Sequence, residues 1–436
     1  MARIAIETYG CTLNRADSDI MENVLASDGN AVQTGYSRSY EGFDYVIVNT
    51  CTVKSPTETR IIDRIKKLSA GGVRLIITGC MASANSDMIL RAAPGASIVT
   101  TSNIHRISDA VAQLAAGRSR VDYSGYSRVD KLAFGGAKGA VISRIAISEG
   151  CVSSCSFCET RFARGPLNSF PHEVILKAIE MNVRKGSREI ELTSQDVGAY
   201  GLDRKTDIAE LLAGAAGIEG DFRIRVGMLN PEHLHRYIDR LIEALCMRSA
   251  YKFLHLPLQS ASNSVLRSMG RNYTIEEFIG YVDEIRAKVR GVSIETDMIA
   301  GYPAESEGDY CDSLSFLRNI RPAFTNVSKF CARPHAKACG MQQLGNRIVK
   351  SRSSEMSRVA RQVQKEDLGK LVGSRASALV TEQNERSFVC RDDYYRIIAL
   401  PRRTPGITLG SRIDAEITGS TSVCLIGRAC ATRSPS

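Results

Sequence analysis

The first third of the chain alternates between short apolar runs and stretches of helical period, and this alternation is the strongest restriction on its fold. The apolar runs cover residues 3–8, 44–50, 74–79 and 97–102. The helical stretches lie near residues 14–28, 55–69, 84–92 and 104–116. Strands that alternate with helices form a parallel sheet with helices on both faces. We therefore predict a doubly wound α/β domain over residues 1–117.

One cysteine follows each of the first three predicted strands: Cys11, Cys51 and Cys80. Parallel strands all end at the same edge of their sheet, where ligands gather. We expect the three thiols to meet at that edge although they are far apart in the chain. A free cysteine is often only a small buried hydrophobe, but three in succession at strand ends favour a set of metal ligands.

Residues 117–139 are rich in glycine, serine and charge, and we predict an interdomain linker there. A second series of strands and helices follows, over residues 137–368. Its predicted strands cover residues 140–148, 189–194, 223–229, 253–259, 293–301 and 324–330, with helices near 171–185, 231–247, 274–289 and 306–320. Six such strands predict an open, partial (β/α)6 barrel, whose chemistry would lie at the C-terminal ends of the strands.

Three more cysteines crowd the loop after the first of these strands. The segment EGCVSSCSFCETRFARG, residues 149–165, contains Cys151, Cys155 and Cys158 in C-x3-C-x2-C spacing. A structural zinc site would need a fourth Cys or His ligand, and the nearest downstream histidine, His172, is predicted to lie on the surface at a helix start. An iron–sulfur cluster held by three thiolates instead leaves one iron open to a small molecule.

Composition limits the cellular setting. No apolar run approaches the roughly 20 residues that span a bilayer, and the N-terminus lacks a signal-peptide core, so we predict a cytoplasmic protein without a membrane anchor. Thiols stay reduced in that compartment, so the clustered members of the 13 cysteines are better explained as metal ligands than as disulfides. A net charge of +10 permits a polyanionic partner such as RNA.

Residues 369–431 form a third predicted domain. A basic, helix-compatible segment leads into alternating strands that glycine and proline interrupt, a pattern typical of a small all-β barrel. Residues 369–436 contain ten Lys and Arg against six Asp and Glu. RNA contact is favoured over a purely structural role, and Arg402 and Arg403, in the PRRTPG loop, are the predicted phosphate contacts.

The C-x3-C-x2-C spacing, with Phe157 before its last cysteine, resembles the signature of the radical S-adenosylmethionine superfamily. This resemblance implies a [4Fe-4S] cluster on Cys151, Cys155 and Cys158. Its open iron would bind S-adenosylmethionine, and an electron from the cluster would split that molecule to release a 5′-deoxyadenosyl radical. A low-potential electron donor is implied as well.

Together with the upstream triplet, the chain resembles the methylthiotransferases. The match runs through GCTLNRADSD, VNTCTVKSPTETR, ITGCMA, EGCVSSCSFCETRFARG, ELTSQDVGAYG, LHLPLQSASNSVLRSMGR and TDMIAGYPAE. VNTCTVKSPTE and LTSQDVGAYG most resemble the archaeal and eukaryotic branch, which acts on N6-threonylcarbamoyladenosine at position 37 of tRNA. The resemblance implies a second [4Fe-4S] cluster on Cys11, Cys51 and Cys80 that provides the sulfur, and an OB-like TRAM domain at the C-terminus.

Several other residues are candidates within this framework. Contacts to S-adenosylmethionine are predicted for Phe157 in the cysteine loop and for five residues at predicted strand ends, which could equally be ordinary polar groups: Ser194, Gln195, Asp196, Gln259 and Asp297. A clamp for the threonylcarbamoyl carboxylate is predicted from Arg161, Arg164 and Arg225, because arginine binds carboxylates bidentately. In ARPHAKA, residues 332–338, relatives carry Gly-Thr after Arg-Pro, which leaves the role of His335 open.

The predicted substrate is therefore the anticodon loop of a tRNA, and the oligomeric state is not indicated. Within the family, the alternatives are a ribosomal-protein aspartate and isopentenyladenosine in tRNA. Outside it, the alternative is an RNA-binding protein in which the cysteines hold structural zinc. A cobalamin-dependent radical enzyme would also carry an N-terminal α/β domain, but its cofactor pocket does not require three strand-end cysteines.

Overall fold

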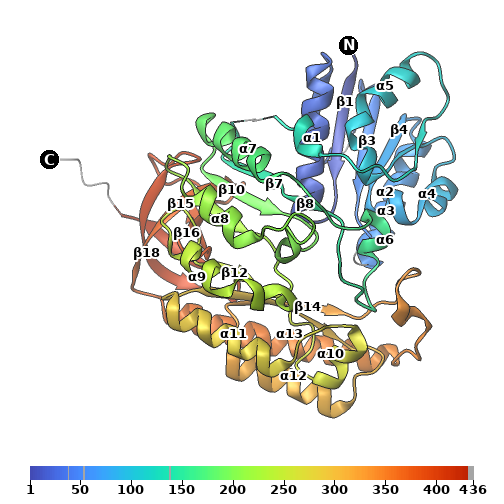
Figure 1. Cartoon of the computed structure of the whole chain (residues 1–436). Coiled ribbons are helices and arrows are strands. Elements are labelled where there is room, and N and C mark those ends of the chain that lie inside the picture. The colour runs from blue at the N-terminus through green and yellow to red at the C-terminus, as the bar shows by residue number, and fades with distance from the viewer. Residues whose placement is uncertain (38, 53–54, 137–138, 431–436) are drawn as a thin grey trace.

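The computed structural model describes residues 1–37, 39–52, 55–136 and 139–430. Three units follow one another along the chain, and Figure 1 shows them side by side. The first is a parallel α/β sheet, the second is a longer series of parallel strands and helices, and the third is a β-barrel. Within the described residues, the helices are all too short or too polar to cross a membrane.

The first unit confirms the predicted parallel sheet. Its strand order is β2-β1-β3-β4-β5-β6. The strands are β1 (Arg3–Thr8), β2 (Ala31–Thr34), β3 (Tyr45–Thr50), β4 (Leu75–Gly79), β5 (Ser97–Val99) and β6 (Asp122–Tyr123). The helices are α1 (Thr12–Ser27), α2 (Ser55–Ala70), α3 (Cys80–Ala84), α4 (Ser86–Ala92) and α5 (Ile107–Ala115).

Helices cover both faces of this sheet because successive side chains of a strand point to opposite faces. Ile4 and Ile6 of β1 join a core with residues of α1 and α5. Ala5, between them, joins a second core with residues of α2, α3 and α4. Both cores consist of apolar side chains with almost no exposed surface, so the sheet is rigid behind the edge that carries the cysteines.

The described part of the stretch predicted as an interdomain linker packs against the rest of the protein. Residues 122–123 form β6 and pair with Ile98 and Val99 of β5. Lys131, in the short 3-10 helix Lys131–Phe134, is 2% exposed. A strand of two residues has no periodicity to detect, and the many polar residues of this stretch hid its packing. Positions 137 and 138 of the predicted linker lie outside the described residues.

The second unit contains two three-stranded parallel sheets, β11-β10-β7 and β12-β13-β14. Isolated bridges from Ile224 to Ala250 and from Met228 to His255 connect their neighbouring edges. The strands are β7 (Ile142–Ala146), β10 (Glu189–Thr193), β11 (Arg223–Val226), β12 (Phe253–His255), β13 (Ser293–Ala300) and β14 (Phe324–Lys329). All six were expected from their apolar runs.

Helices cover these strands, and their apolar side chains share one large core with the strands. They are α7 (His172–Arg184), α8 (Ile208–Ala216), α9 (Ile238–Cys246), α10 (Asn263–Met269), α11 (Ile275–Lys288) and α12 (Glu307–Ile320). The sequence did not predict α8 and α10. Helix α11 begins at a capping box, in which Thr274 accepts from the Glu277 backbone and the Glu277 carboxylate accepts from the Thr274 backbone.

Helix α13 (Asn346–Gly369) leads into the third unit, a closed barrel of order β15-β16-β17-β19-β18. Its strands are β15 (Arg375–Gln383), β16 (Ser387–Asp392), β17 (Ile397–Pro401), β18 (Arg412–Ser420) and β19 (Leu425–Ala429). The predicted all-β barrel is thus confirmed. The β16–β17 turn packs on the second unit, where Tyr395 donates to Glu191 at 3.2 Å and Arg223 donates to Asp393 at 2.9 Å.

Candidate active site

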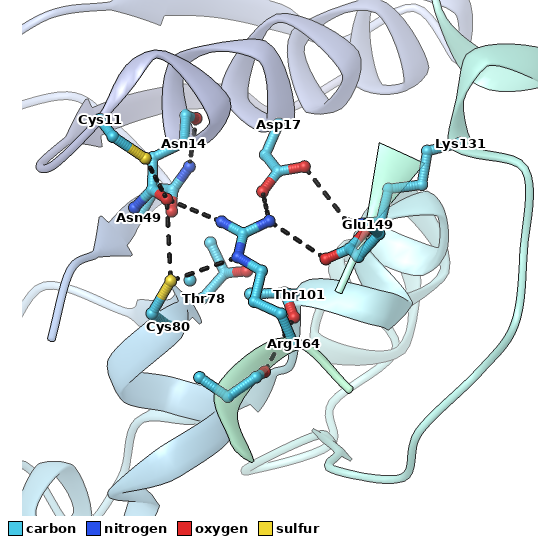
Figure 2. Close-up of polar contacts among 12 residues, drawn as sticks. Cys11, Asn14, Asp17, Asn49, Thr78, Cys80, Thr101, Lys131, Glu149 and Arg164 are labelled. Atoms are coloured by element: carbon cyan, nitrogen blue, oxygen red, sulfur yellow. Dashed lines mark hydrogen bonds and ion pairs between the residues drawn. The ribbon is translucent and has the colours of Figure 1, made fainter. Parts of the chain in front are cut away.

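The structure brings Cys11, Cys51 and Cys80 to one edge of the first sheet, after the adjacent strands β1, β3 and β4. Asn14 on α1 links them. Its Oδ1 lies 3.7 Å from Cys11 Sγ and 3.8 Å from Cys80 Sγ, and its Nδ2 donates to the Thr50 carbonyl at 2.8 Å (Figure 2). The sheet edge therefore gathers the upstream triplet as predicted from the strand order.

Two glycines permit this close approach. Gly10 has φ +110°, and a Cβ there would lie 2.8 Å from Cys51 Cβ and 3.1 Å from its Sγ. Gly79 has φ +90°, and a Cβ there would lie 2.2 Å from the Thr50 carbonyl oxygen. Any side chain would push the strand ends apart, and positive φ is costly for other residues.

Cys151, Cys155 and Cys158 lie in the loop between β8 (Ser148–Glu149) and α6 (Thr160–Arg164). The Cys158 backbone donates to the Cys155 carbonyl at 3.1 Å, so the loop turns tightly. Ser156, between them, is fixed by Tyr302, whose hydroxyl lies 2.8 Å from Ser156 Oγ. Phe157 packs at the edge of the small core that contains Tyr302.

One thiol of each triplet is buried in surroundings that disfavour its free thiolate. Burial raises the pKa of Cys80 to about 12, and the charge of Arg164 only partly offsets this. Burial, with a contribution from Asp196, also raises the pKa of Cys151 to about 12. The thiolate is the form that binds metal. The positive charge of bound iron would therefore have to offset the cost of burying a negatively charged thiolate.

Among the described residues, no three Cys, His, Asp or Glu side chains stand close enough together to chelate one metal ion. Each triplet also lacks a fourth cysteine in its loop. Cysteine thiolates are the ligands that hold iron–sulfur clusters, so the chemistry of each triplet fits such a group.

Unpartnered polar atoms lie beside the radical triplet. Asp196 is 2% exposed, and its Oδ1 accepts from the backbones of Gly198 at 2.9 Å and Asn230 at 3.0 Å. Its Oδ2 accepts no hydrogen bond among the described residues but lies 3.6 Å from His233 Nε2. Ser194 Oγ and Gln195 Oε1 are buried without a hydrogen-bond partner among the described residues. Buried polar atoms are nearly always satisfied in a working protein, so Ser194 and Gln195 are suited to a polar ligand.

Gln259 and Asp297 lie next to each other, but neither ends its strand as predicted, because Asp297 lies inside β13 and Gln259 lies beyond the end of β12. The Gln259 backbone donates to the Asp297 carbonyl at 2.8 Å. Gln259 has φ +76°, an uncommon conformation for a non-glycine residue. The Asp297 carboxylate lies 3.0 Å from His255 Nε2. Burial acts to lower the pKa of His255, but this hydrogen bond and the charge of Glu295 outweigh burial and raise it.

A buried arginine at the radical triplet was not predicted. Arg271 donates to Asn230 Oδ1 at 2.7 Å, and its guanidinium lies 5.6 Å from the centre of the Phe157 ring. Asn230 in turn donates to Ser153, inside the cysteine loop, at 3.1 Å. Burial acts to lower the pKa of Arg271, but the charges of Tyr273 and Cys155 help to raise it above that of a free arginine. Arg271 ends the LHLPLQSASNSVLRSMGR motif of the family resemblance, but only the fold shows that its side chain reaches the cysteine loop.

The loops of the two triplets touch each other. Thr52, directly after Cys51, has its hydroxyl 2.6 Å from Oε1 of Glu159, directly after Cys158. The same hydroxyl lies 2.5 Å from Glu58, which forms an ion pair with Arg333 of the second unit. The loops that carry the two triplets are therefore in contact where the first unit meets the second.

The structure places Arg164 differently from the predicted carboxylate clamp. Its side chain is fully buried and lies 2.8 Å from Asp17, 3.1 Å from Glu149 and 3.2 Å from Cys80 Sγ. Burial acts to lower its pKa, but Asp17 and Cys80 raise it well above the ordinary value. Its donors are committed to these partners, so it contacts the upstream triplet and is closed to a substrate.

The other predicted arginines remain accessible or only partly committed. Arg161 is exposed and donates to the Val152 carbonyl at 3.3 Å. Arg225 stacks 5.4 Å from the Phe253 ring centre, and its Nε is buried without a hydrogen-bond partner among the described residues. Arg402 and Arg403 are exposed in the loop between β17 and β18, with Arg402 lying 4.5 Å above the Phe388 ring.

His335, whose role was open, joins three segments. Its ring stacks on Phe162 of α6 at 3.7 Å between centres and 10° between planes. Its Nε2 lies 3.1 Å from the carbonyl of Ala84, at the end of α3. It thus fills the contact between the radical loop and the first unit.

Comparisons with solved structures show the fold. The radical S-adenosylmethionine methyltransferase TsrM from Kitasatospora setae, solved with cobalamin and a [4Fe-4S] cluster, aligns with a TM-score of 0.55 at 13% identity. The match covers 78% of this chain and 77% of that one. The cobalamin-dependent radical enzyme OxsB also aligns with a TM-score of 0.55, over 84% of this chain and 56% of that one.

Sequence comparisons identify the family. The model of the Radical SAM superfamily matches residues 145–317, and the model described as "Uncharacterized protein family UPF0004" matches residues 3–101. A Pyrococcus abyssi protein named "Probable threonylcarbamoyladenosine tRNA methylthiotransferase" is 39% identical over 98% of this chain and 99% of its own length. The human protein named "Threonylcarbamoyladenosine tRNA methylthiotransferase" is 30% identical over 95% of this chain and 72% of its own length. With relatives matched over nearly its whole length and a radical domain between residues 145 and 317, the chain belongs to the threonylcarbamoyladenosine tRNA methylthiotransferases of the radical S-adenosylmethionine superfamily.

Proposed function

We propose that this chain adds a methylthio group to carbon 2 of N6-threonylcarbamoyladenosine at position 37 of tRNA. The contact between Thr52 and Glu159 carries the proposal, because it joins the loop of the upstream triplet to the loop of the radical triplet. A reaction that first activates carbon 2 and then delivers sulfur to it needs both groups at one place. The family relatives support the choice of substrate.

Two [4Fe-4S] clusters fit the residues present. Cys151, Cys155 and Cys158 would hold the cluster that binds S-adenosylmethionine, and Cys11, Cys51 and Cys80 would hold the second. When bound, these groups supply a carbon radical that removes the unactivated hydrogen of carbon 2, and the sulfur that replaces it. The reduction needs a low-potential electron donor, which the family chemistry implies.

Protein side chains would hold and orient S-adenosylmethionine. Ser194 Oγ and Gln195 Oε1, which lack hydrogen-bond partners among the described residues, and Asp196 Oδ2, which accepts no hydrogen bond there, can accept from its amino and hydroxyl groups. Asp297 lies in β13 with Gln259 beside it, and Phe157 of the cysteine loop packs against the small core that contains Tyr302. These residues fix the cofactor and exclude water, which protects a reactive carbon radical from side reactions.

The finer architecture also belongs to this proposal. Residues 137–368 would form a partial (β/α)6 radical barrel, because six parallel strands follow one another with helical crossovers. Residues 1–117 would form the methylthiotransferase domain, and residues 369–431 a TRAM domain of OB type. The closed five-stranded barrel supports the last assignment.

Metal and sulfide analysis after anaerobic reconstitution tests the proposal against the zinc hypothesis. Two clusters predict about eight irons per chain with matching sulfide. Incubation with a reductant and S-adenosylmethionine should then yield 5′-deoxyadenosine. Stoichiometric zinc without sulfide would exclude the enzyme and leave an RNA-binding protein.

The C-terminal barrel provides a separate prediction about tRNA binding. Arg403→Gln should weaken tRNA affinity and flatten its salt dependence, because each phosphate contact contributes a log–log slope of about −0.9 on duplex nucleic acid. Arg402→Gln together with Arg403→Gln should do more. Filter binding at a series of salt concentrations measures both quantities.

Arg428→Gln is the matched control for this prediction. It removes the same charge from the barrel, but Arg428 already pairs with Glu416 at 2.9 Å. Equal affinities and slopes for Arg403→Gln and Arg428→Gln would mean that the PRRTPG loop does not contact phosphate. Point variants are preferable to truncation before Gly369. Truncation would remove Tyr395 and expose Tyr251 and Phe253, on which its ring packs.

A further inference from the structure

A buried network of two cations and two carboxylates lies behind the upstream triplet. Arg164 comes from α6, Asp17 from α1, Glu149 from β8 and Lys131 from the 3-10 helix of the connecting stretch (Figure 2). Their side chains are 0%, 1%, 8% and 2% exposed, respectively. We call these four residues the Arg164 network.

The network joins segments from both units through alternating charges. Arg164 Nη1 lies 2.8 Å from Asp17 Oδ2 and 3.1 Å from Glu149 Oε1. Lys131 Nζ lies 3.3 Å from Asp17 Oδ1 and also contacts Glu149. Each carboxylate therefore lies between the two cations.

The remaining donors of the guanidinium point toward the cysteines. Nη2 of Arg164 donates to Asn14 Oδ1 at 2.7 Å, and the same Oδ1 lies near the thiols of Cys11 and Cys80. Nε of Arg164 donates to Cys80 Sγ at 3.2 Å (Figure 2). The planar guanidinium group of Arg164 thus contacts the two carboxylates through one nitrogen and the upstream triplet, with Asn14, through the other two.

Stability alone does not account for this arrangement. Taking charges out of water is costly, and buried ion pairs can often be replaced by apolar side chains without loss. A planar guanidinium also has a property that an apolar residue lacks, because it fixes several donors in one geometry. Hydrogen bonds to the cysteine sulfurs are among the protein's means of setting the potential of an iron–sulfur cluster.

We propose that Arg164 is a positioning residue of the upstream triplet, which holds Cys80 as a ligand and raises the reduction potential of the cluster bound there. A donor on a ligand sulfur withdraws charge from the cluster and so favours its reduced state. Arg164 lies in the helix that directly follows the radical triplet, so the upstream cluster is held by the same segment that carries the other three cysteines. The inference rests on the proposed function only in placing an iron–sulfur cluster on the upstream triplet.

The test measures the upstream cluster alone. In full-length chain with Cys151, Cys155 and Cys158 all replaced by alanine, only the upstream triplet remains to bind iron. Arg164→Lys keeps the positive charge, but a lysine ammonium cannot make all of the contacts that the guanidinium group makes. Lys131→Gln is the matched control, because it removes a buried cation of the same network whose contacts are with Asp17 and Glu149. Iron and sulfide content, thermal melting and redox titration followed by electron paramagnetic resonance are measured for each variant.

We expect Arg164→Lys to shift the midpoint potential to more negative values, and Lys131→Gln to shift it less while lowering the melting temperature. Loss of iron from Arg164→Lys but not from Lys131→Gln would also support the assignment, since it shows that Cys80 needs this partner. An unchanged potential with full iron content, or equal effects of both variants, would overturn it and leave a structural ion network. If the parent itself bound no iron and sulfide, the proposed function would fail instead.

Discussion

Replacing Cys155 with alanine is expected to abolish the formation of 5′-deoxyadenosine, whereas replacing Cys51 leaves it measurable and ends the insertion of sulfur. Cys155 belongs to the loop that would hold S-adenosylmethionine, and its thiol lies close enough to Asp196 to be affected by that charge. Cys51 lies on the other side of the contact between Thr52 and Glu159. The two variants therefore remove different halves of one site. Chromatography of the nucleoside products separates 5′-deoxyadenosine from methylthiolated adenosine.

Cys246→Ala is the control for this pair, because Cys246 is an exposed cysteine at the end of α9, in neither triplet. It should retain both products. A Cys51 variant that made methylthiolated product at the rate of the unaltered chain would show that the upstream triplet is not the source of sulfur. A Cys155 variant that still made 5′-deoxyadenosine would contradict the assignment of the radical triplet.

Much of the fold could be predicted because its strands are short apolar runs with turn residues at their ends. Their order along the chain was enough to place Cys11, Cys51 and Cys80 at one sheet edge, since parallel strands share their direction. The radical triplet needed only local spacing. Both inferences use information that lies within a few residues or within a repeated pattern.

The position of Arg164 could not be predicted in the same way. Its neighbours in sequence are the radical cysteines, which favoured a substrate contact close to them. Its actual partners, Asp17 and Glu149, come from other elements, and its burial is decided by how the first unit packs on the second. The burial of Lys131 could not be predicted for a similar reason. Its segment is polar, and nothing in the neighbouring sequence indicates that its charge is buried.

Arg271 illustrates the same limit at the radical triplet. It lies far along the chain from the cysteines, after α10, a helix that the sequence did not predict. Only the folded chain brings it to Asn230 and Phe157. Polar residues at strand ends, such as Asp196, were easier to identify because the position of a strand end is itself a functional signal in parallel α/β folds.

A large difference in activity is also expected between tRNA substrates that carry different groups on the target adenosine. The enzyme should modify tRNA that carries N6-threonylcarbamoyladenosine and leave the isopentenyl form and the unmodified base unchanged. Carbon 2 must leave the base stack to react, and an anticodon loop presents its bases already unpaired. The threonylcarbamoyl group adds a carboxylate, which calls for a fixed cation, preferably a bidentate arginine. An isopentenyl group would require an apolar pocket instead.

Two arginines are available for this carboxylate, now that Arg164 is committed to the upstream triplet. Arg161 is exposed beside the radical loop, and Arg225 has a buried Nε without a hydrogen-bond partner among the described residues. Arg161→Gln and Arg225→Gln should raise the KM for tRNA and leave the uncoupled cleavage of S-adenosylmethionine intact. Mass spectrometry of nucleosides from each tRNA substrate measures the selectivity. Product from the isopentenyl form alone, or from a ribosomal protein, would overturn the substrate and leave the radical chemistry standing, because that chemistry depends on the cysteines and not on these arginines.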